Sequence, residues 1–541
     1  MCAVVIADTE NWLALECPAG TLYWRASLDG QQPIGTPNSV ERLEEWIRRQ
    51  EGNWAALLMT PEAAYLMTDQ ARSFPLHVAL GSTTYVTSTI EALRGRVPFA
   101  LNADAAAEFA HSGYVFGEET LLEGIVSLPT SCLAVVREGT LVTRQYTDFY
   151  VEHTDDSERF WELFKEEMLA SYSSLLQRAN GRQLLIPLSG GIDSRLQLAV
   201  LRELDAPNVV NFTYGKANSA EARISQRTAA LAGFDWVFVE QDGARVAQAW
   251  NRPGNNGFLR HAWEGNALPH IQDWYALGKL RELDQIQDDA IVAPGHTVVG
   301  NQHHAEVLQP GTSVTKARFA RAIAENHFSL RRRPDRAMAA PYTAAKISSF
   351  MNEHWADGVA QRRSEMMHHI NLDNRQAKYI TNSVRAYEYF GFDWALPMYE
   401  RRFHELWLSG PFGIYSPDRA QYRAFTNAWF AEVTGEELEY FHVAPAPKVR
   451  WGRAQLLAIA KKLKLVDKVN LLHSVKTQLN HPMGFEGFAR GFSTGRLGAK
   501  LVRGSTLMGI FAEEFLNNTW VPGQDVVPCS PHGSGAARRP A

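Results

Sequence analysis

The residues with the clearest chemical potential lie between an apolar run, Leu184–Leu188, and a helical pattern that starts near Ser194. Two adjacent glycines in this turn allow the backbone to approach a phosphate without a side chain in the way. Backbone N–H groups at the start of the helix point at such an anion, and the helix dipole favours negative charge there. We therefore predict a phosphate-binding turn formed by Leu188, Ser189, Gly190, Gly191, Ile192, Asp193 and Ser194.

The polar side chains of this turn divide into two hydroxyls and one carboxylate. Ser189 and Ser194 can donate hydrogen bonds to a phosphate. Asp193 would repel a phosphate unless a cation lies between them, so we predict that it binds Mg²⁺. The chain has no GxxxxGK[ST] pattern, so the turn is not a Walker loop. The alternative is an ordinary strand-to-helix turn with a serine N-cap.

Composition narrows the class of protein. The 541 residues carry a net charge of −5, and 45% of them are hydrophobic. There is no overall basic field, no apolar run of bilayer length and no signal-peptide pattern. We therefore expect a cytoplasmic protein without nucleic-acid or membrane partners. Four widely spaced cysteines form no CxxC pair, so neither zinc nor disulfides are expected: Cys2, Cys17, Cys132 and Cys529.

Patterning divides the chain into a strand-rich part and an alternating part. Residues 1–155 read as short alternating strands with few helices, which predicts an α+β domain around an antiparallel sheet. From about Asp156, a long helix is followed by strands at Leu184–Leu188, Val209–Tyr214 and Trp236–Glu240 with helices between them. This alternation predicts a doubly wound parallel sheet, an α/β fold, with a helical C-terminal extension. The predicted boundaries are 1–155, 156–525 and a disordered tail, 526–541.

The segment SGGIDS resembles the pyrophosphate loop of the N-type ATP pyrophosphatases. The resemblance implies that the loop holds the β- and γ-phosphates of ATP and that cleavage between the α- and β-phosphates gives an acyl-adenylate and pyrophosphate. Nucleotides bind at the carboxyl ends of parallel strands. In this family the strand after the loop contacts adenine through its backbone, which here implies Thr213, Tyr214 and Gly215.

The N-terminal part resembles the amidotransferase domain of asparagine synthetases, over EGNWAALLMTPEAAYLMTDQARSFPLHV, YVTSTIEALRG and LLEGIVSLPTSCLAVVREG. A working glutaminase of that family uses Cys2 as its nucleophile. Here Ala3 replaces the following glycine, and the RGPD-like and NGE-type segments are missing. A nucleophile without its oxyanion donors loses most of its rate advantage. We therefore predict a degenerate, Ntn-type glutaminase-like domain in which Cys2 is vestigial or structural.

The C-terminal half points to one branch of the superfamily. ITNSVRAYEYFGFDWALPMYE, TYGKANSAEARISQ and ALPHIQDW are similar to segments of lasso peptide cyclases, which close a macrolactam and have a degenerate N-terminal domain. The resemblance implies ATP and Mg²⁺ as cofactors and a precursor peptide as substrate. It also implies a leader peptidase as partner and leaves open a leader-binding protein.

The second half-reaction requires a base, because an amine is mostly protonated at neutral pH. Asp393 lies four residues before Pro397, in register with the glutamate of the family's GLExRVPF-like motif, and Glu388 lies five residues earlier. Both are predicted bases; the alternatives are a helix cap and a solvated charge. Lys448 matches the lysine with which related β-lactam synthetases stabilise developing negative charge.

One turn departs from the family. Where the resemblance implies an acidic residue after a glycine-rich turn, the chain reads PGHTVVGNQHH. Gly295 and His296 are therefore predicted to contact phosphate, and the second Mg²⁺ ligand is left open. Three further readings stay open beside the cyclase: an asparagine synthetase, a β-lactam-synthetase-like cyclase, and a catalytically inactive peptide-binding scaffold.

Overall fold

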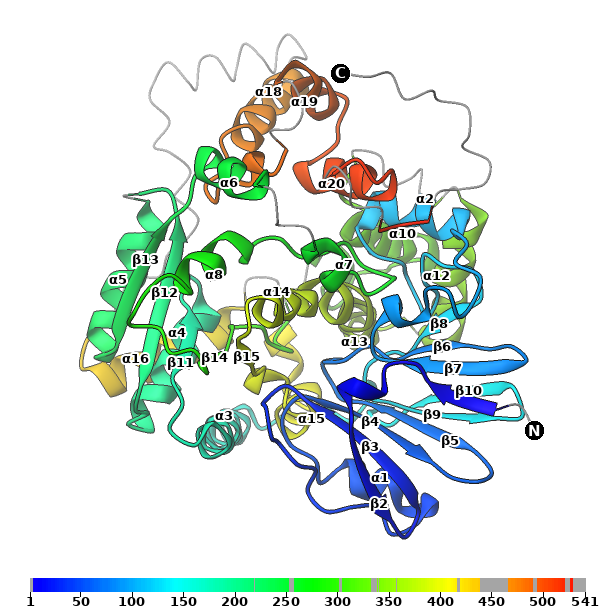
Figure 1. Cartoon of the computed structure of the whole chain (residues 1–541). Helices are drawn as coiled ribbons and strands as arrows, with labels where there is room; N and C mark the ends of the chain where they lie inside the picture. Colours follow the sequence, from blue (N-terminus) through cyan, green and yellow to red (C-terminus); the bar gives the residue numbers. More distant parts are fainter. Residues whose placement is uncertain are drawn as a thin grey trace.

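The computed structural model places an antiparallel, strand-rich region beside a parallel sheet with surrounding helices (Figure 1). The structure describes residues 3–217, 219–252, 257–300, 304–331, 338, 340–356, 358–415, 419–437, 466–489, 494–520 and 526–528. The predicted combination of a parallel sheet with a preceding antiparallel region is confirmed at this level. Among the predictions, Cys2, Lys448 and most of the C-terminal tail lie outside the described residues.

The N-terminal region contains two stacked sheets. The larger is antiparallel, with the order β10-β9-β5-β4-β3-β2. Its strands are β2 (Leu13–Cys17), β3 (Gly20–Ala26), β4 (Trp54–Met59), β5 (Ala64–Thr68), β9 (Cys132–Arg137) and β10 (Thr140–Gln145). The smaller sheet has the order β1-β7-β6-β8, in which β1 and β7 are parallel. Its strands are β1 (Ala3–Ile6), β6 (His77–Ala79), β7 (Thr83–Thr87) and β8 (Ile125–Ser127).

Alternation along β4 explains why the larger sheet is covered on both faces. Successive strand residues point to opposite faces. Ala55 and Leu57 belong to the main core that the two sheets share. Trp54 and Leu58 face the other way, into a separate cluster with Trp46 of helix α1 (Leu43–Ile47). The apolar run is therefore buried from both sides, as a central strand requires.

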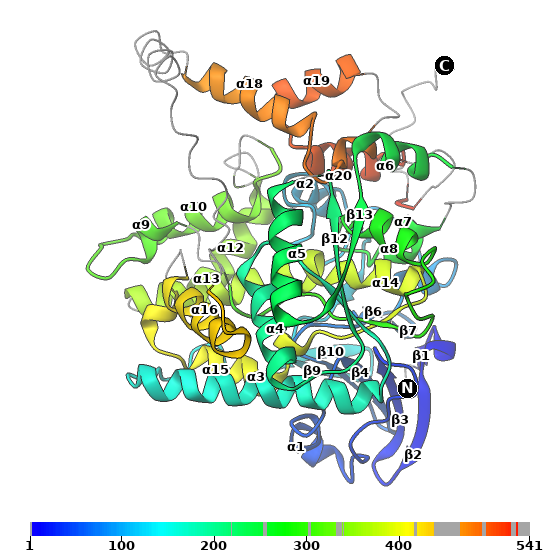
Figure 2. The same cartoon turned by 90° about the vertical axis from the view of Figure 1, so that its left-hand side faces the viewer.

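The parallel sheet has the strand order β13-β12-β11-β14-β15, and every neighbouring pair is parallel. Its strands are β11 (Leu184–Pro187), β12 (Val209–Gly215), β13 (Asp235–Glu240), β14 (Ile291–Val292) and β15 (Asp393–Trp394). Figure 2 shows helices α4 (Ile192–Glu203) and α5 (Ala220–Ala232) in front of this sheet, with the long helix α3 (Ser157–Ala179) running across below them. The chain leaves β11 toward β12 on one side and later returns to β14 on the other. The strand order therefore reverses between β11 and β14, and this is where ligands bind in open α/β sheets.

Helices dominate the rest of the chain. They are α2 (Ala103–Ser112), α6 (Gly243–Trp250), α7 (Phe258–Ala262), α8 (Trp274–Leu280), α9 (Ala305–Leu308), α10 (Lys316–His327), α12 (Pro341–His354), α13 (Ala360–Asn371), α14 (Val384–Tyr389), α15 (Arg401–Leu408), α16 (Ala420–Thr434), α18 (Val466–Gln478), α19 (Thr494–Val502) and α20 (Leu507–Leu516). A π-helical stretch, η4 (Leu372–Ile380), follows α13 directly. Short 3₁₀ turns are η1 (Thr9–Asn11), η2 (Val40–Arg42), η3 (Ile90–Leu93), η5 (Thr381–Ser383), η6 (Pro397–Tyr399), η7 (Phe412–Tyr415) and η8 (Phe485–Gly487).

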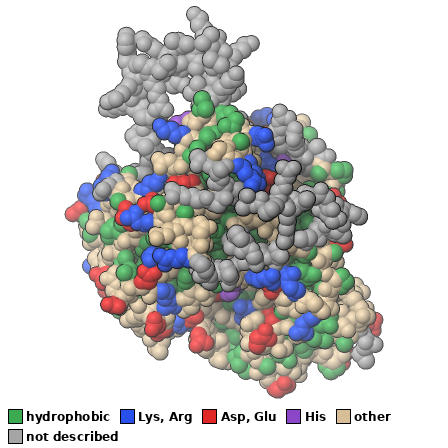
Figure 3. Space-filling model, turned by 45° about the horizontal axis from the view of Figure 1, so that its top comes forward, with side chains coloured by type: hydrophobic (Ala, Val, Ile, Leu, Met, Phe, Trp, Pro, Cys, Tyr) green, Lys and Arg blue, Asp and Glu red, His purple; other side chains and the backbone are tan. Residues whose placement is uncertain are grey.

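The surface of the described residues carries mixed charge. On the face in Figure 3, Lys and Arg side chains are interspersed with Asp and Glu. In the part of the chain that the structure describes, no helix combines the length and the apolar character needed to span a bilayer.

Candidate nucleotide site at the switch point of the parallel sheet

The predicted phosphate turn lies at the switch point and is held in shape by its own serines. β11 ends at Pro187, and α4 begins at Ile192 with Gly191 as its N-cap residue. The Ser189 hydroxyl accepts a hydrogen bond from the Gly191 N–H at 3.1 Å. The Ser194 hydroxyl donates to the Ser189 carbonyl, also at 3.1 Å. The two hydroxyls therefore fix the path of the turn in addition to facing its ligand side.

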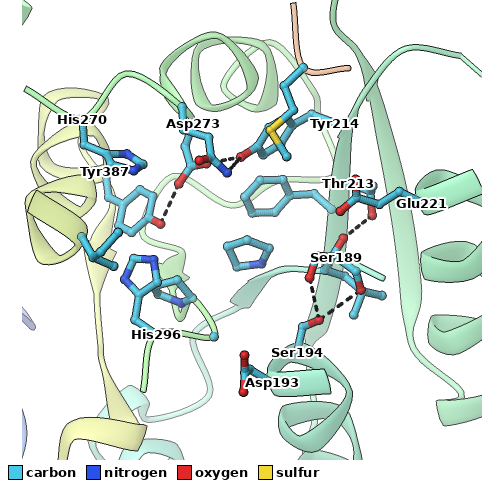
Figure 4. Close-up of a pocket in the computed structure, with 18 residues that line it drawn as sticks. Ser189, Asp193, Ser194, Thr213, Tyr214, Glu221, His270, Asp273, His296 and Tyr387 are labelled. Atoms are coloured by element: carbon cyan, nitrogen blue, oxygen red, sulfur yellow. Dashed lines mark hydrogen bonds between the residues drawn. The ribbon is translucent and has the colours of Figure 1, made fainter. Parts of the chain in front are cut away.

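A pocket of about 290 Å³ opens onto this turn (Figure 4). Eight of the residues predicted for the nucleotide site line it: Leu188, Ser189, Asp193, Ser194, Thr213, Tyr214, Gly295 and His296. Four others, Gly190, Gly191, Ile192 and Gly215, are not among its lining residues. Ile192 is buried in the main core, so its side chain anchors the turn. The structure therefore brings most of the predicted nucleotide-site residues together around one cavity.

The turn after β14 packs closely against the phosphate turn. A Cβ atom on Gly295 would lie 3.2 Å from Gln197 Oε1 and 3.4 Å from the Ser194 nitrogen. Glycine therefore permits the close approach of the turns that follow β11 and β14, although these strands end at Pro187 and Val292. The Thr213 hydroxyl donates to the Leu188 carbonyl at 2.7 Å and connects the third strand end to the same place.

Two carboxylates, Asp193 and Glu221, lie beside the turn. Asp193 Oδ1 accepts hydrogen bonds from Arg419 at 2.8 Å and from the Tyr422 hydroxyl at 2.9 Å. Burial raises the pKa of the Glu221 carboxyl group, and the nearby Gly190 backbone offsets part of that rise. One of the N–H groups expected to bind phosphate, that of Gly190, is thus close enough to a carboxylate to affect its pKa. A phosphate that binds there has to compete with Glu221.

The fit to Mg²⁺ rests on Asp193. Among the described residues, no group of three His, Cys, Asp or Glu side chains could hold a metal ion. Mg²⁺ is usually bound through only one or two carboxylates, with substrate phosphates and water completing its shell. Asp193 meets that requirement, because both of its hydrogen bonds go to Oδ1. In the described part of the chain, Oδ2 accepts no hydrogen bond.

The pocket wall opposite the turn carries an acidic group that the sequence did not reveal. Asp273 is 6% exposed and lines the pocket. Its Oδ2 accepts a hydrogen bond from the Tyr387 hydroxyl at 2.9 Å, and its Oδ1 accepts one from the Tyr214 hydroxyl. Asp193 and Glu221 lie at the phosphate end. Asp273 is therefore the lining carboxylate at the other end of the cavity, among the described residues.

Two histidines stand on the same wall and are neutral. Burial lowers the pKa of the His270 and His296 imidazoles to about 4. The Nδ1 atoms of both rings are buried and have no hydrogen-bond partner among the described residues. A buried polar atom without a partner is costly, so a ligand that pairs with these nitrogens would gain affinity. Figure 4 shows both rings near Tyr387, across the cavity from Ser189 and Ser194.

The predicted base Asp393 lies away from this pocket. It pairs in register with Ile291, which pairs with Leu184, the first residue of β11. At about 3.3 Å per residue, the strand separates that level from the phosphate turn by about 13 Å. Its carboxylate accepts hydrogen bonds from Arg182 at 2.7 Å and from the Asp29 N–H at 2.8 Å. Asp393 thus connects the parallel sheet to the N-terminal region. It lies at the start of its strand, whereas the nucleotide pocket lies at the other end of the parallel strands.

Glu388 also lies outside the lining of the pocket. It accepts hydrogen bonds from Arg385 at 2.8 Å and from the Trp394 indole at 2.9 Å. Burial alone would raise the pKa of Glu388, but the charges of Arg385 and Arg25 lower it overall. Both carboxylate oxygens are thus used within a buried ionic cluster. The structure does not bring either predicted base to the nucleotide pocket.

Comparisons with known proteins assign no family. No protein-family model matches the chain, and no curated protein matches it. One similar solved structure is the NH3-dependent NAD synthetase from Campylobacter jejuni subsp. jejuni NCTC 11168 in complex with the nitrate ion. It is 15% identical, with a TM-score of 0.20, and the match covers 39% of this chain and 95% of that chain.

Two more solved structures show similarly distant matches. The U34-tRNA thiolase NcsA from Methanococcus maripaludis is 12% identical with a TM-score of 0.22, and the match covers 64% of this chain and 80% of that one. The glutamine phosphoribosylpyrophosphate amidotransferase from B. subtilis is 10% identical with a TM-score of 0.16, and the match covers 54% of this chain and 63% of that one. At these identities and TM-scores, the matches carry no functional argument.

Proposed function

We propose that this chain is an ATP-dependent amide ligase that activates a carboxylate as an acyl-adenylate. One observation carries the proposal: a glycine turn between a buried strand and a helix opens into a pocket at the switch point of a parallel sheet. Backbone N–H groups and a helix N-terminus suit this turn to phosphate. The pocket continues past the turn to a second set of polar side chains, which suits a site where two reactants meet.

In the first step, a carboxylate oxygen attacks the α-phosphorus of ATP, and pyrophosphate leaves as the α–β bond breaks. The turn would hold the outer phosphates through its backbone N–H groups, among them that of Gly190 beside Glu221. Asp193 would hold Mg²⁺, which neutralises phosphate charge when bound. His296 is neutral, so its ring adds no charge and can donate to a phosphate or carboxylate oxygen.

In the second step, an amine attacks the acyl carbon, AMP leaves, and the nitrogen loses a proton. Asp273 is placed to accept that proton, either directly or through the Tyr387 hydroxyl that donates to it. A base positioned in this way contributes roughly 10²- to 10⁴-fold to a rate. This assignment moves the role of base from Asp393 and Glu388 to a residue that lines the pocket.

The finer proposal is a lasso peptide cyclase. The enzyme would adenylate an Asp or Glu side chain of a precursor peptide, and the N-terminal amine freed by a leader peptidase would close the macrolactam. The proposal is supported by the sequence segments around Tyr387 and Asp273 that resemble such cyclases. It is also supported by the missing glutaminase segments. Holding a peptide in a near-closed shape before reaction would supply part of the rate.

The test uses the purified full chain with ATP, Mg²⁺ and a leader-free candidate peptide. The proposal expects AMP, pyrophosphate and a peptide lighter by one water. The Asp193→Asn variant is the matched control and should produce little AMP. Asparagine formed from aspartate and ammonia, with no reaction of the peptide, would identify an asparagine synthetase. A chain that binds no nucleotide would be the inactive scaffold.

A further inference from the structure

The outer edge of strand β10 is open to another strand. In the described residues, β10 pairs with β9 alone and ends the six-stranded sheet. Glu138 and Gly139, the two turn residues before β10, have φ values of 51° and 77°. A tight two-residue hairpin of this kind pairs Arg137 and Thr140 by hydrogen bonds. Tyr146 continues this series, because its N–H donates to the Ser131 carbonyl at 2.8 Å.

Along β10, residues that hydrogen-bond to β9 alternate with residues whose backbone groups face outward. Residues 140, 142, 144 and 146 bond toward β9, so the N–H and C=O groups of Leu141, Thr143 and Gln145 point the other way. An edge of this kind is a template for an added strand. An extended peptide can use it through main-chain hydrogen bonds, with pockets beside the edge selecting its side chains.

A cavity of about 680 Å³ lies beside this edge. It is bounded by Thr143, Arg144 and Gln145, three consecutive residues of β10. Alternate strand residues point to opposite faces, so a cavity that touches all three runs along the edge of the sheet. The opposite walls come from α12 and from the π-helical stretch η4. π-Helical segments occur frequently at functional sites.

The carboxylates of this cavity lack Lys or Arg partners. Among the described residues, Glu118 has no ion pair, and Glu353 and Asp373 pair only with histidines. The Glu118 carboxylate accepts a hydrogen bond from the Thr143 hydroxyl of β10 at 3.3 Å, and burial raises its pKa. An incoming cation would meet carboxylates that no described Lys or Arg side chain contacts directly, although the Lys378 charge acts on Glu118 from nearby.

The cations of the cavity, by contrast, are already paired. Arg144 contacts Glu44 at 2.7 Å. Lys346 contacts Glu108 at 3.3 Å and Glu119 at 3.2 Å. The Lys378 ammonium donates to the carbonyls of Val115 and Gly117 and to the Asn374 side chain, so all three of its N–H donors are used.

Aromatic rings complete a cation-binding environment. Phe350 and His354 line the cavity, with their ring centroids 4.7 Å apart. The face of an aromatic ring attracts an ammonium or guanidinium group. The combination of rings with carboxylates that lack a described Lys or Arg partner therefore favours a Lys or Arg side chain over an acidic or purely apolar one.

We propose that an extended peptide adds to the outer edge of β10 and places a Lys or Arg side chain in this cavity, beside Glu118 and Phe350. The bound segment would be a stretch of the substrate peptide away from the reacting groups. Its identity as substrate rests on the proposed function, whereas the binding itself does not require ATP.

The test measures binding by fluorescence anisotropy, without nucleotide. The probe is a fluorescein-labelled, amide-capped peptide, Thr-Val-Lys-Val-Thr. One comparison peptide has Glu in place of Lys, and another has alternate backbone nitrogens methylated. We expect the Lys peptide to bind with one site per chain, and both comparison peptides to bind at least tenfold more weakly. No binding of the Lys peptide, or equal binding of all three, would overturn the proposal.

Protein variants locate the site. Glu118→Gln should weaken binding of the Lys peptide about tenfold. A tenfold change in affinity corresponds to about 1.4 kcal/mol, which is the size expected for a desolvated charge contact. Thr143→Pro removes an outward N–H, and edge strands tolerate proline there, so it should abolish binding of the same peptide. Glu123→Gln, an exposed carboxylate elsewhere, is the matched control and should bind as wild type does. Unchanged affinity in Glu118→Gln would assign the peptide to another surface.

A separate measurement of ATP–pyrophosphate exchange distinguishes failure of the proposed β10 peptide site from failure of the proposed ligase activity. Exchange without peptide binding would refute only the β10 site. Peptide binding without exchange would refute only the ligase.

Discussion

We expect the replacement of Asp273 with asparagine to separate the two proposed half-reactions. Asp273 accepts hydrogen bonds from two tyrosine hydroxyls and lines the pocket opposite the phosphate turn. Asparagine keeps the shape but loses the charge, and its NH₂ group cannot accept a proton from an attacking amine. In the mechanism we propose, the carboxylate is activated at the other end of the pocket, beside the phosphate turn. The substitution should therefore spare adenylation and slow amide formation.

The expected size follows from the role. Loss of a positioned base slows a step by about 10²- to 10⁴-fold, or about 3 to 5 kcal/mol at 1.36 kcal/mol per tenfold change. Two hydrogen bonds to a charged acceptor also become weaker, and each contributes about 1.5 to 3 kcal/mol. We expect a lower free energy of unfolding as well, so activity has to be compared at a temperature where both proteins are folded.

The assay measures ATP–pyrophosphate exchange for activation and product mass for amide formation. Asp273→Asn should keep exchange within a few-fold of wild type and lose amide product. Asp393→Asn is the comparison variant. This variant loses the ion pair between Asp393 and Arg182, which lies far from the pocket. It should therefore lower the stability of the protein and leave both pyrophosphate exchange and amide formation unchanged. If Asp393→Asn abolished the amide step while Asp273→Asn left it intact, the assignment of the base would be wrong.

Three further predictions follow from the site and the core. Ser189→Ala removes the acceptor of the Gly191 N–H. The loss of about 1 kcal/mol should weaken ATP binding about fivefold, which calorimetry can measure. Unchanged affinity would show that the hydroxyl does not shape the turn. Glu221→Gln should tighten inorganic pyrophosphate binding, because a neutral group no longer repels phosphate at the Gly190 N–H. Since burial raises the pKa of Glu221, wild type should approach the variant as pH falls, and parallel pH profiles would contradict this. Burial lowers the pKa of His404 to about 3, whereas an unfolded histidine titrates near 6.5; stability is therefore lost as pH falls below 6.5, by about 2 kcal/mol at pH 5. Denaturant melts of His404→Gln should lack that share of the acid loss, and an identical acid dependence would contradict the assignment.

Local patterning was sufficient for the elements around the phosphate turn. Between the second and third strands of the parallel sheet, where a helix was predicted, α5 runs from Ala220 to Ala232, because Ser219 caps it and Gly233 terminates it in the left-handed region. Strand β11 and the turn after it follow from an apolar run that stops at two glycines. These signals lie within a few residues of the structure that they specify, so the sequence predicts them directly.

The far wall of the pocket was not predictable in this way. Asp273 and Tyr387 are separated by 114 residues and meet only because α8 and α14 pack beside each other. A lone aspartate before a helix most often signals a cap, and nothing in its neighbours distinguishes it. The prediction that Asp393 is the base rests only on its position four residues before Pro397. β15 is only two residues long and runs parallel to β11, so its first residue lies at the edge opposite the nucleotide pocket.

The π-helical stretch η4 was also missed, for a related reason. Side chains of its first turns reach the N-terminal region: Asp373 accepts a hydrogen bond from Gln145 at 3.0 Å, and Asn374 accepts one from the Gly117 N–H at 2.9 Å. Such partners lie more than 200 residues away in the sequence. The hydrophobic periodicity of the segment indicates a helix. It does not distinguish an α-helix from the wider π-helix that is found together with these contacts.

In the proposed reaction, the turn from Leu188 to Ser194 holds the outer phosphates of ATP while a carboxylate receives the AMP group. The most direct measurement uses a substrate whose side-chain carboxylate carries oxygen-18, with mass analysis of the released nucleotide. We expect AMP that contains one labelled oxygen, together with unlabelled pyrophosphate. Release of ADP and labelled phosphate, or of AMP without label, would contradict it.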